Sequence, residues 1–298
     1  GFRHPNTADA MNSLGVSNTV LGNYAQGIRF CEQAYDVKES LYGINHSDTA
    51  VTINNLASLY HLNGIHDRAM QLYNQAWDIK KKTLGRAHPD TIKMYGQVGR
   101  LYHDQGDYEK ALTRLLENLR LREKILPHDH PQIAVAKNSL AALYVDMSEY
   151  EKAKVLAQES LDLRIRLLGE EHPYTAFSHD TLARALLALG NINEAKDHAL
   201  VSYRIRQRML GLRHPRMAMA YMTLARVKSA QDDGEHAELN ACKAKAVCVD
   251  SLPKDHPLLD ECEKLLKQML IKHGDLRKKI TDKHYWRSSR SFLVTEEE

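Results

Sequence analysis

The chain has 298 residues, of which 43% are hydrophobic and 27% charged, so it can bury a large core and is not biased toward disorder before its C-terminal end. Its formal net charge of +3 is too small to indicate a nucleic-acid-binding protein, in which Lys and Arg cluster on one face. No apolar run approaches the roughly 20 residues that are needed to span a bilayer.

A histidine recurs every 42 residues, at positions 4, 46, 88, 130, 172, 214 and 256. Proline follows it in six of the seven copies, and Ser47 follows it in the remaining one. An internal period of roughly 20 to 50 residues is the signature of a solenoid or a similar array. We therefore expect six units that start near residues 4, 46, 88, 130, 172 and 214. The chain begins at Gly1, inside the joint motif, so we expect a piece of a longer protein.

The second unit shows how each unit is expected to fold. Its first half carries apolar residues at helical spacing, namely Ile53, Leu56, Ala57 and Tyr60. Gly64 is a cap or turn residue after this helix. A second apolar stripe follows, formed by Ala69, Leu72, Tyr73 and Ala76, and Gly85 ends it. Each unit is thus predicted to be a pair of antiparallel helices.

The repeated histidines invite a chemical explanation, because histidine is a common metal ligand and acid-base group. Neighbouring copies are separated by a whole helix pair, which is too far apart to share a metal ion bound at about 2 Å. The proline that follows suits the first turn of a helix. We interpret each histidine as structural, hydrogen-bonding to backbone between repeats. A role as a ligand or catalyst is the alternative.

Small residues recur at one position in the first helix of each unit, where they let neighbouring helices approach closely. These residues are Gly15, Ala57, Gly99, Ala141, Ala183 and Ala225. The sixth unit departs from the pattern, since Lys228 stands where the second, third and fourth units have tyrosine and QDDG replaces the usual turn. End repeats of an array are often atypical and polar. Residues 256–274 are accordingly predicted to form a capping helix.

The pattern of these units resembles the tetratricopeptide repeat over about residues 4 to 270. It is carried by Leu56, Ala57, Tyr60, Gly64, Ala69, Tyr73 and Ala76, with counterparts at Val98, Gly99, Tyr102, Gly106 and Ala111, and at Leu140, Ala141, Tyr144 and Ala153. The 42-residue period, the joint LGxxHPxT and the segment NNLASLY resemble the kinesin light chain type of repeat. This resemblance implies an all-α fold: a right-handed superhelical solenoid of about six helix pairs with a capping helix, forming one domain over residues 1–274.

Polar side chains are expected on the concave side of the solenoid, which the first helices of the units line. They are Asn12, Asn54, Asn55, Lys93, Gln97, Arg100, Asn138, Asp180, Arg184 and Arg226. Amide side chains can pair with the backbone of an extended peptide, and arginine offers a fork of donors to carboxylates. The resemblance to kinesin light chains implies that such positions bind short, often acidic peptides. A solvated polar face is the alternative.

The C-terminal segment, residues 275–298, is basic, then rich in serine between arginines, then acidic. It is interpreted as a flexible linker, with a phosphorylation-tuned switch or an internal ligand for the groove as alternatives. In the last case its FLV and EEE runs would dock on Arg184 or Arg226.

The sequence gives little support for catalysis. It contains no GxxxxGK phosphate loop, no GxSxG elbow and no HExxH motif, so we expect no enzyme activity, no cofactor and no metal. The four cysteines form no CxxC pair, and the start GFRHPNTADA has no apolar signal-peptide core, which favours a cytoplasmic protein with reduced, packed thiols.

The predicted function is that of an adaptor that binds an extended acidic segment of a partner or cargo protein. By its resemblance to kinesin light chains, the parent protein is expected to associate with a microtubule motor heavy chain through regions outside this chain, and with the cytoskeleton. We expect no nucleic acid and no membrane insertion. The alternative is a sensor arm of a STAND-type signalling protein with a nucleotide-switch domain.

Overall fold

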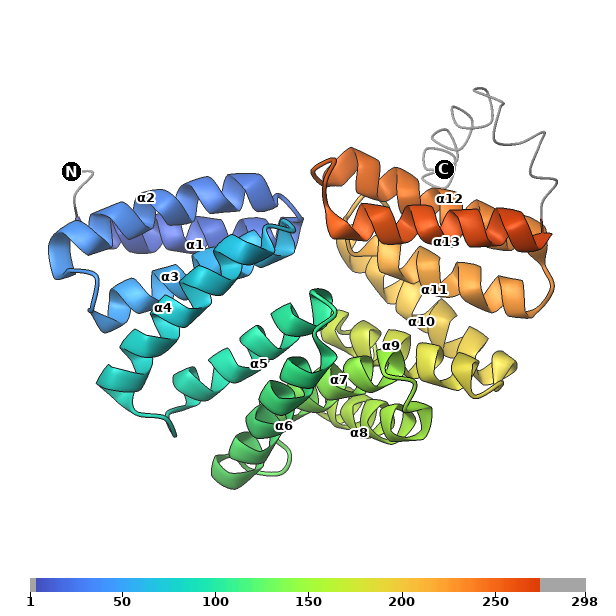
Figure 1. Cartoon of the computed structure of the whole chain (residues 1–298), viewed down its shortest axis with the longest axis horizontal. Coiled ribbons are helices and arrows are strands. Elements are labelled where there is room, and N and C mark those ends of the chain that lie inside the picture. The colour runs from blue at the N-terminus through green and yellow to red at the C-terminus, as the bar shows by residue number, and fades with distance from the viewer. Residues whose placement is uncertain (1–3, 274–298) are drawn as a thin grey trace. The chain divides into compact units, whose positions relative to one another are not determined.

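The computed structural model describes residues 4–273, and within that range it contains thirteen α-helices and no strand (Figure 1). The first members of the helix pairs are α1 Pro5–Leu21, α3 Ser47–Leu62, α5 Pro89–Asp104, α7 Pro131–Asp146, α9 Pro173–Ala188 and α11 Met217–Ala230. The second members are α2 Tyr24–Tyr42, α4 His66–Leu84, α6 Tyr108–Ile125, α8 Tyr150–Leu168, α10 Ile192–Leu210 and α12 Gly234–Ser251. The predicted capping helix is α13 Pro257–His273.

The chain divides into two compact units, one ending at Leu143 and the other beginning at Tyr144, and each is described by itself. The all-α prediction is confirmed, with six helix pairs and a thirteenth helix. The superhelical hand and the single domain over residues 1–274 stay predictions. The predicted tail, residues 275–298, lies outside the described residues.

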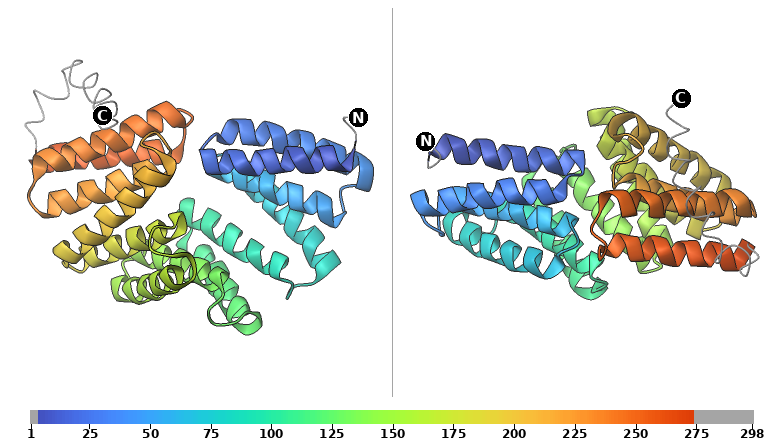
Figure 2. Two further views of the ribbon diagram at one scale, coloured as in Figure 1. Left: turned by 180° about the vertical axis from the view of Figure 1, so that it is seen from behind. Right: turned by 90° about the horizontal axis from the view of Figure 1, so that it is seen from above.

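Within each unit, second helices pack on neighbouring first helices. In the first unit these contacts join α1 to α2, α2 to α3, α3 to α4, α4 to α5, and α5 to α6 (Figure 2). In the second unit they run without a break from α8 to α13. First helices also contact one another, α1 with α3, and α9 with α11 and α11 with α13. The prediction that Gly64 and Gly85 end the two helices of the second repeat is confirmed. They follow α3 and α4 with φ of 81° and 84°.

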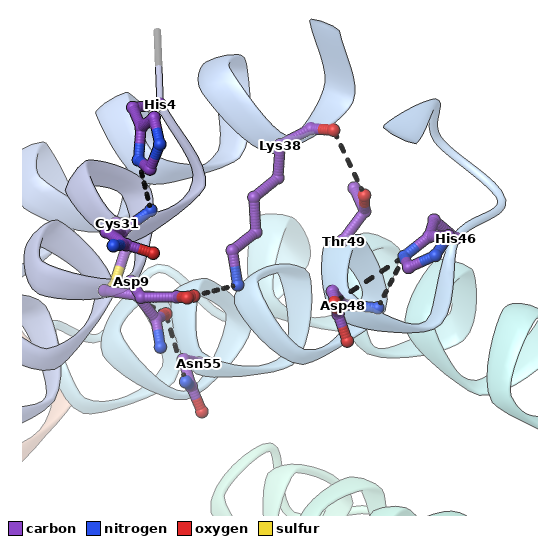
Figure 3. A network of polar contacts seen from close by, with 10 residues as sticks. His4, Asp9, Cys31, Lys38, His46, Asp48, Thr49 and Asn55 are labelled. Carbon is purple, nitrogen blue, oxygen red and sulfur yellow. Dashed lines mark hydrogen bonds and ion pairs between the residues drawn. The ribbon is translucent and has the colours of Figure 1, made fainter. Parts of the chain in front are cut away.

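Six of the seven repeated histidines cap the N-terminus of the helix that follows, and His214 makes the same bond to Arg216 in the turn just before α11. The Nδ1 atom of each accepts a hydrogen bond from the backbone N–H two residues later, at 3.1 to 3.2 Å. His4 and His46 are drawn in Figure 3. This bond satisfies one of the amides that have no partner inside the helix. The structural interpretation of these histidines is confirmed.

Substitutions at His172 test whether this hydrogen bond stabilises the protein. Its Nδ1 accepts the bond from the Tyr174 N–H at 3.1 Å. Asparagine places Oδ1 where the imidazole has Nδ1, so His172→Asn should keep the cap and the free energy of unfolding. Glutamine places its oxygen one bond farther out, so His172→Gln should cost about 1 kcal/mol. Urea unfolding of the two variants makes the comparison. Equal losses in both would mean that the hydrogen bond contributes nothing.

The predicted small residues do lie at close helix contacts. Ala57, Ala141, Ala183 and Ala225 are fully buried. Gly15 shows why bulk is excluded, because a Cβ built there would lie 2.2 Å from Sγ of Cys31 and 3.1 Å from the carbonyl oxygen of Gly27. The α1–α2 pair therefore depends on the absence of a side chain at Gly15.

The cost of adding a side chain at Gly15 should depend on the residue at position 31. Alanine favours a helix over glycine by about 1 kcal/mol, whereas overpacking typically costs about 1 to 3 kcal/mol. Gly15→Ala should therefore destabilise the protein when Cys31 is present and should cost less in a Cys31→Ala background, where the sulfur is gone and only the approach to the Gly27 carbonyl oxygen remains. Thermal unfolding of the single and double variants measures both effects. A destabilisation of equal size in both backgrounds would exclude the clash with Cys31 as its cause.

A column of buried cations runs along the second helices, again at intervals of 42 residues. Its members, Lys38, Lys80, Arg122, Arg164 and Arg206, are between 1% and 5% exposed. Three of them bind the residue two positions after the next histidine: Lys80 pairs with the Asp90 carboxylate at 3.0 Å, and Arg122 and Arg164 donate to the backbone carbonyls of Gln132 and Tyr174 at 2.6 and 2.5 Å. These three contacts join each repeat to the one that follows it.

The two ends of the column differ in their partners. Lys38 pairs with Asp9 of its own repeat at 2.8 Å (Figure 3). Arg206 would meet Arg216 at the equivalent place in the next repeat, and two guanidinium groups repel. Arg206 instead donates to Oδ1 of Asp180 at 3.4 Å and lies over the ring of Phe177 at 5.0 Å.

Candidate functional site

Two arginines occupy the same repeat position on neighbouring helices of the second unit. Arg184 lies on α9 and Arg226 lies 42 residues later on α11, and these helices contact each other. Both side chains are partly exposed. Helix packing therefore brings two guanidinium groups to one face of the second unit.

Arg184 already has one acidic partner. Its Nη2 donates to Oδ1 of Asp146, at the C-terminal end of α7, at 2.5 Å. The Arg184 and Asp146 side chains are 19% and 32% exposed, so solvent weakens this pair only in part. One carboxylate leaves several N–H groups of the guanidinium available for a second acceptor.

Unlike Arg184, Arg226 has no direct partner. Within residues 4–273 it makes no hydrogen bond and no ion pair. Loss of solvation lowers its pKa, the charge of Arg184 lowers it further, and the carboxylates of Asp180, Glu261 and Asp146 oppose the shift. Because its side chain is still partly exposed, an anion that reached it would replace lost hydration and relieve repulsion from Arg184.

Asp180, predicted to belong to the same surface, lies beneath it. It is 3% exposed and accepts hydrogen bonds from Oγ1 of Thr223 at 3.1 Å and from Arg206 at 3.4 Å. A ligand could not contact this carboxylate unless the side chains around it moved. Its negative charge is committed to the buried Arg206.

The first unit carries a separate cationic face on α5. Lys93 and Arg100 are seven residues apart, hence on one side of the helix, and neither has a hydrogen bond or ion pair among the described residues. Lys93 is exposed by surface area, yet protein around its ammonium group removes enough solvation to lower its pKa. The charges of Lys80, Arg100 and Arg122 add to this shift, and Asp90 opposes it.

The predicted amide positions mostly hold the first helices together. Asn55 donates to Oδ1 of Asn12 at 3.1 Å, which joins α3 to α1, and Gln97 donates to Oγ of Ser58 at 2.9 Å, which joins α5 to α3. Gln97 is only 5% exposed. We number repeat positions by their distance from the repeated histidine, so Asn12 is at position eight and Asn55 and Gln97 are at position nine. These positions face the neighbouring first helix, and their side chains form hydrogen bonds between first helices.

The other two predicted amides have a buried oxygen without a hydrogen-bond partner. Asn54 is 6% exposed as a whole residue, whereas Asn138 is partly exposed. Of the ten predicted site residues, those with substantial exposure are therefore Asn12, Asn55, Lys93, Arg100, Asn138, Arg184 and Arg226.

Two features of the second unit were not anticipated from the sequence. Nδ1 of His179 and Nδ1 of His198 lie 2.8 Å apart between α9 and α10. Burial, followed by the charge of His198, lowers the pKa of His179 to about 4. In addition, Arg206 and Arg216 both lie over the ring of Phe177, at 5.0 and 5.3 Å. The 42-residue column of cations could have been found from spacing, but no local motif signals the histidine pair.

The described residues contain no cluster of three or more His, Cys, Asp or Glu side chains that could hold a metal ion. All four cysteines are buried and unbridged, as predicted for packed thiols. Sγ of Cys248 lies 3.6 Å from Sγ of Cys262, and the pKa of the Cys248 thiol is raised by its hydrogen bond to Cys262 and by burial. Among residues 4–273, none of the helices has the length and apolar character to cross a membrane.

A family model described as tetratricopeptide repeat matches residues 6–82, 90–164 and 132–208, which together are more than half of the chain. A comparison with curated protein sequences finds no match. Among solved structures, the chain is similar to nearly identical TPR-like repeats of a kinesin light chain from Podosopora anserina. The identity is 24%, the TM-score is 0.53, and the match covers 69% of this chain and 97% of that one.

Two further structures share the fold. BtubC (BKLC) from P. vanneervenii is 20% identical with a TM-score of 0.54, over 78% of this chain and 91% of that one. A Signal Transduction ATPase with Numerous Domains (STAND) protein with a tetratricopeptide repeat sensor, from Pyrococcus horikoshii, is 17% identical with a TM-score of 0.54. That match covers 98% of this chain and 42% of the STAND protein. At these identities the likenesses show the fold alone.

Proposed function

The chain belongs to the tetratricopeptide-repeat family, and from this premise we propose that it binds an extended acidic segment of a partner protein on the face that carries Arg184 and Arg226. Tetratricopeptide repeats are scaffolds for protein interaction, and a helix array offers long surfaces on which an unfolded segment can lie. The proposal adds a position and a ligand chemistry to that general role.

The observation that carries the proposal is the state of Arg226. It is cationic, short of solvation, repelled by Arg184 and without a direct ion pair among the described residues, while solvent still reaches it. A carboxylate of the ligand would supply the missing charge and could accept two parallel N–H bonds from the guanidinium. The proposed contact therefore favours Glu or Asp over uncharged side chains.

The first unit offers a second cationic position for an acidic ligand, at Lys93 and Arg100. Its ammonium and guanidinium groups have no partner among the described residues. Asn12, Asn55 and Asn138 are the partly exposed amides of the predicted set. Asn138 could bond to a ligand backbone directly, and Asn12 and Asn55 could do so with the groups that their mutual hydrogen bond does not use. Asn54, Gln97 and Asp180 are buried, so we propose for them the structural part of holding the first helices in place.

We further propose that the protein is an adaptor without enzyme activity, in the cytoplasm. As in the predicted relation to kinesin light chains, the parent protein would join a cargo to a motor heavy chain and associate with the cytoskeleton. The alternative is the sensor arm of a nucleotide-switch protein, supported by a fold likeness to the STAND sensor that spans 98% of the chain. Heptad repeats elsewhere in the parent protein would favour the adaptor, and a phosphate loop would favour the sensor.

The proposal is tested by titrating the chain with a short fluorescein-labelled peptide of alternating Glu and Ser, and with the same peptide in which every Glu is replaced by Gln. Fluorescence anisotropy should show saturable binding of the Glu peptide, weakened by added salt because the contacts are between charges. The Gln peptide should bind at least about tenfold more weakly. Equal affinities for the two peptides would exclude an acidic ligand.

A further inference from the structure

The guanidinium group of Arg206, on α10, has two buried donors without a partner. Arg206 is 1% exposed, and its Nε and Nη2 atoms make no hydrogen bond among the described residues. Within residues 4–273 its one hydrogen bond runs from Nη1 to Oδ1 of Asp180, and it is long at 3.4 Å. A buried charged donor without an acceptor costs free energy, so such a group in a native protein indicates a bound ion or an ordered water.

The preceding repeat shows which acceptors are missing. Arg164, 42 residues earlier on α8, donates to the carbonyl of Tyr174 at 2.5 Å and to Oγ of Ser178 at 3.0 Å. Oγ of Ser160, one helical turn before Arg164, lies 2.9 Å from the same Ser178 oxygen. Two polar side chains of α8 thus converge on one hydroxyl of α9.

Neither acceptor is available to Arg206. Ala220 stands at the position of Ser178 and has no hydroxyl. In addition, α11 begins at Met217, three residues after its histidine, whereas the other first helices begin directly after theirs. The carbonyl that corresponds to the one of Tyr174 therefore belongs to Arg216, in the turn before the helix, and it accepts no bond from Arg206.

A third unpartnered donor lies beside the first two. Ser202 corresponds to Ser160, is fully buried, and its Oγ has no hydrogen-bond partner in the described part of the chain. Ser202 and Arg206 are four residues apart, hence neighbours on one side of α10. Because the equivalent side chains on α8 meet at one acceptor, we expect the three donors on α10 to meet at one place as well.

The charges at this place are unbalanced. Arg206 and Arg216 both lie over the ring of Phe177, at 5.0 and 5.3 Å, and Asp180 is the one carboxylate that pairs with Arg206. Burial lowers the pKa of Arg206, Asp180 opposes this shift, and the charge of Arg216 adds to it. Arg216 makes no ion pair within residues 4–273 and is partly exposed. One positive charge is thus left without a counter-ion.

We propose that Arg206, Ser202 and Arg216 bind one small oxyanion that carries a phosphate or carboxylate group. Nε and Nη2 lie on the same edge of the guanidinium, so their N–H bonds form the fork that fits two oxygens of one such group. The hydroxyl of Ser202 supplies a third donor, and Arg216, on the solvent side, supplies the second charge. A water molecule could accept some of these bonds but would leave the charge unbalanced.

The experiment is isothermal titration calorimetry of the full chain with inorganic phosphate and with acetate, in a chloride buffer of constant ionic strength. We expect one phosphate or one acetate to bind per chain, and the tighter of the two identifies the group that the site prefers. Binding in the presence of chloride also shows preference for an anion with two oxygens. If neither anion binds, the proposal is wrong, because water or chloride then satisfies Arg206.

Arg206→Lys should weaken the binding of the anion about tenfold or more, because lysine keeps the charge beside Asp180 but has no fork. The fold should tolerate this change, since Lys38 and Lys80 occupy the same position in earlier repeats. Arg164→Lys is the matched control and should leave the affinity unchanged, because Arg164 already has its acceptors. Circular dichroism verifies that each variant is folded.

Arg216→Gln gives a second test that leaves the buried Arg206 in place, and it should also weaken binding. Unchanged affinity in Arg206→Lys, or an equal loss in the control variant of α8, would overturn the proposal. Loss of binding in Arg226→Gln, with the affinity of Arg206→Lys unchanged, would also overturn it, because the anion would then lie beside Arg184 and Arg226. The titrations use no peptide, so they can fail or succeed independently of the proposed acidic ligand.

Discussion

Arg226→Glu is expected to weaken the binding of an acidic peptide by at least about tenfold, the largest effect of any single change on the proposed face. Hydrogen bonds to charged groups contribute about 1.5 to 3 kcal/mol, and reversal adds repulsion between the new carboxylate and the ligand. Arg226→Glu should weaken binding more than Arg184→Glu, because Arg184 already donates a hydrogen bond to Asp146. Anisotropy titrations of both variants with the Glu–Ser peptide measure this order.

The matched control for charge reversal is Arg213→Glu, which changes the net charge equally at an exposed residue between α10 and α11. Its affinity for the acidic peptide should be close to that of the unmodified chain. If all three reversals weakened binding to the same extent, the effect would come from net charge and not from a defined site. Loss of binding through changes on the second helices, with Arg184 and Arg226 dispensable, would place the site on the other face.

The free energy of unfolding should fall by about 3 kcal/mol as the pH is lowered from about 6.5 to about 4, through His179 alone. Burial next to His198 lowers the pKa of His179 from 6.5 to about 4. Between these values the unfolded chain takes up a proton that the folded chain does not, at about 1.4 kcal/mol per pH unit. Stability is therefore full above pH 6.5 and declines as the pH falls toward 4. Urea unfolding across this range measures the slope.

Several groups face the His179 ring or its partner. His198 lies on α10 together with Glu194 and Asp197, whose charges oppose the lowering of the His198 pKa by burial. His179→Gln should reduce the fall in the free energy of unfolding between pH 6.5 and 4. His128→Gln, at an exposed histidine, should leave that fall unchanged. Carboxylates with lowered pKa values, such as Asp104, lose their stabilising charge only below about pH 4. An unchanged slope in His179→Gln would show that the histidine pair does not control acid stability.

Much of the fold could be predicted, because the same sequence pattern recurs in six units and each copy predicts the same helix pair. The spacing of the histidines, the glycines after most helices and the apolar stripes agree with one another, and the structure confirms the helix pairs they predict. The small residue at Gly15 and its equivalents could also be predicted, since only close packing explains a conserved lack of volume within one chain.

The candidate site was harder to predict, because helical spacing gives the side of a helix but not the tilt between neighbouring helices. Asn54, Gln97 and Asp180 have the right residue types and lie on first helices, yet they are buried. The tilt directs repeat positions eight and nine into the contact with the next first helix, as Asn12 with Asn55 shows. Arginines at position twelve, one turn farther along, remain partly exposed.

The contacts between repeats also explain what no motif signalled. His179 and His198 come from two different helices, and their approach to 2.8 Å depends on how α9 packs on α10. The unpartnered donors of Arg206 likewise cannot be read from residue type, because Arg164 at the equivalent position has its acceptors. Both features follow from packing partners.

The central claim is that an acidic segment lies against Arg184 and Arg226, and chemical protection of arginine tests it most directly. Phenylglyoxal modifies accessible guanidinium groups, and mass spectrometry of the digested chain reports the rate at each arginine. With the Glu–Ser peptide at saturation, modification of Arg184 and Arg226 should slow markedly, while Arg213 reacts at its original rate. Unchanged rates at Arg184 and Arg226 under saturating peptide would contradict the account, whatever the affinity of the complex.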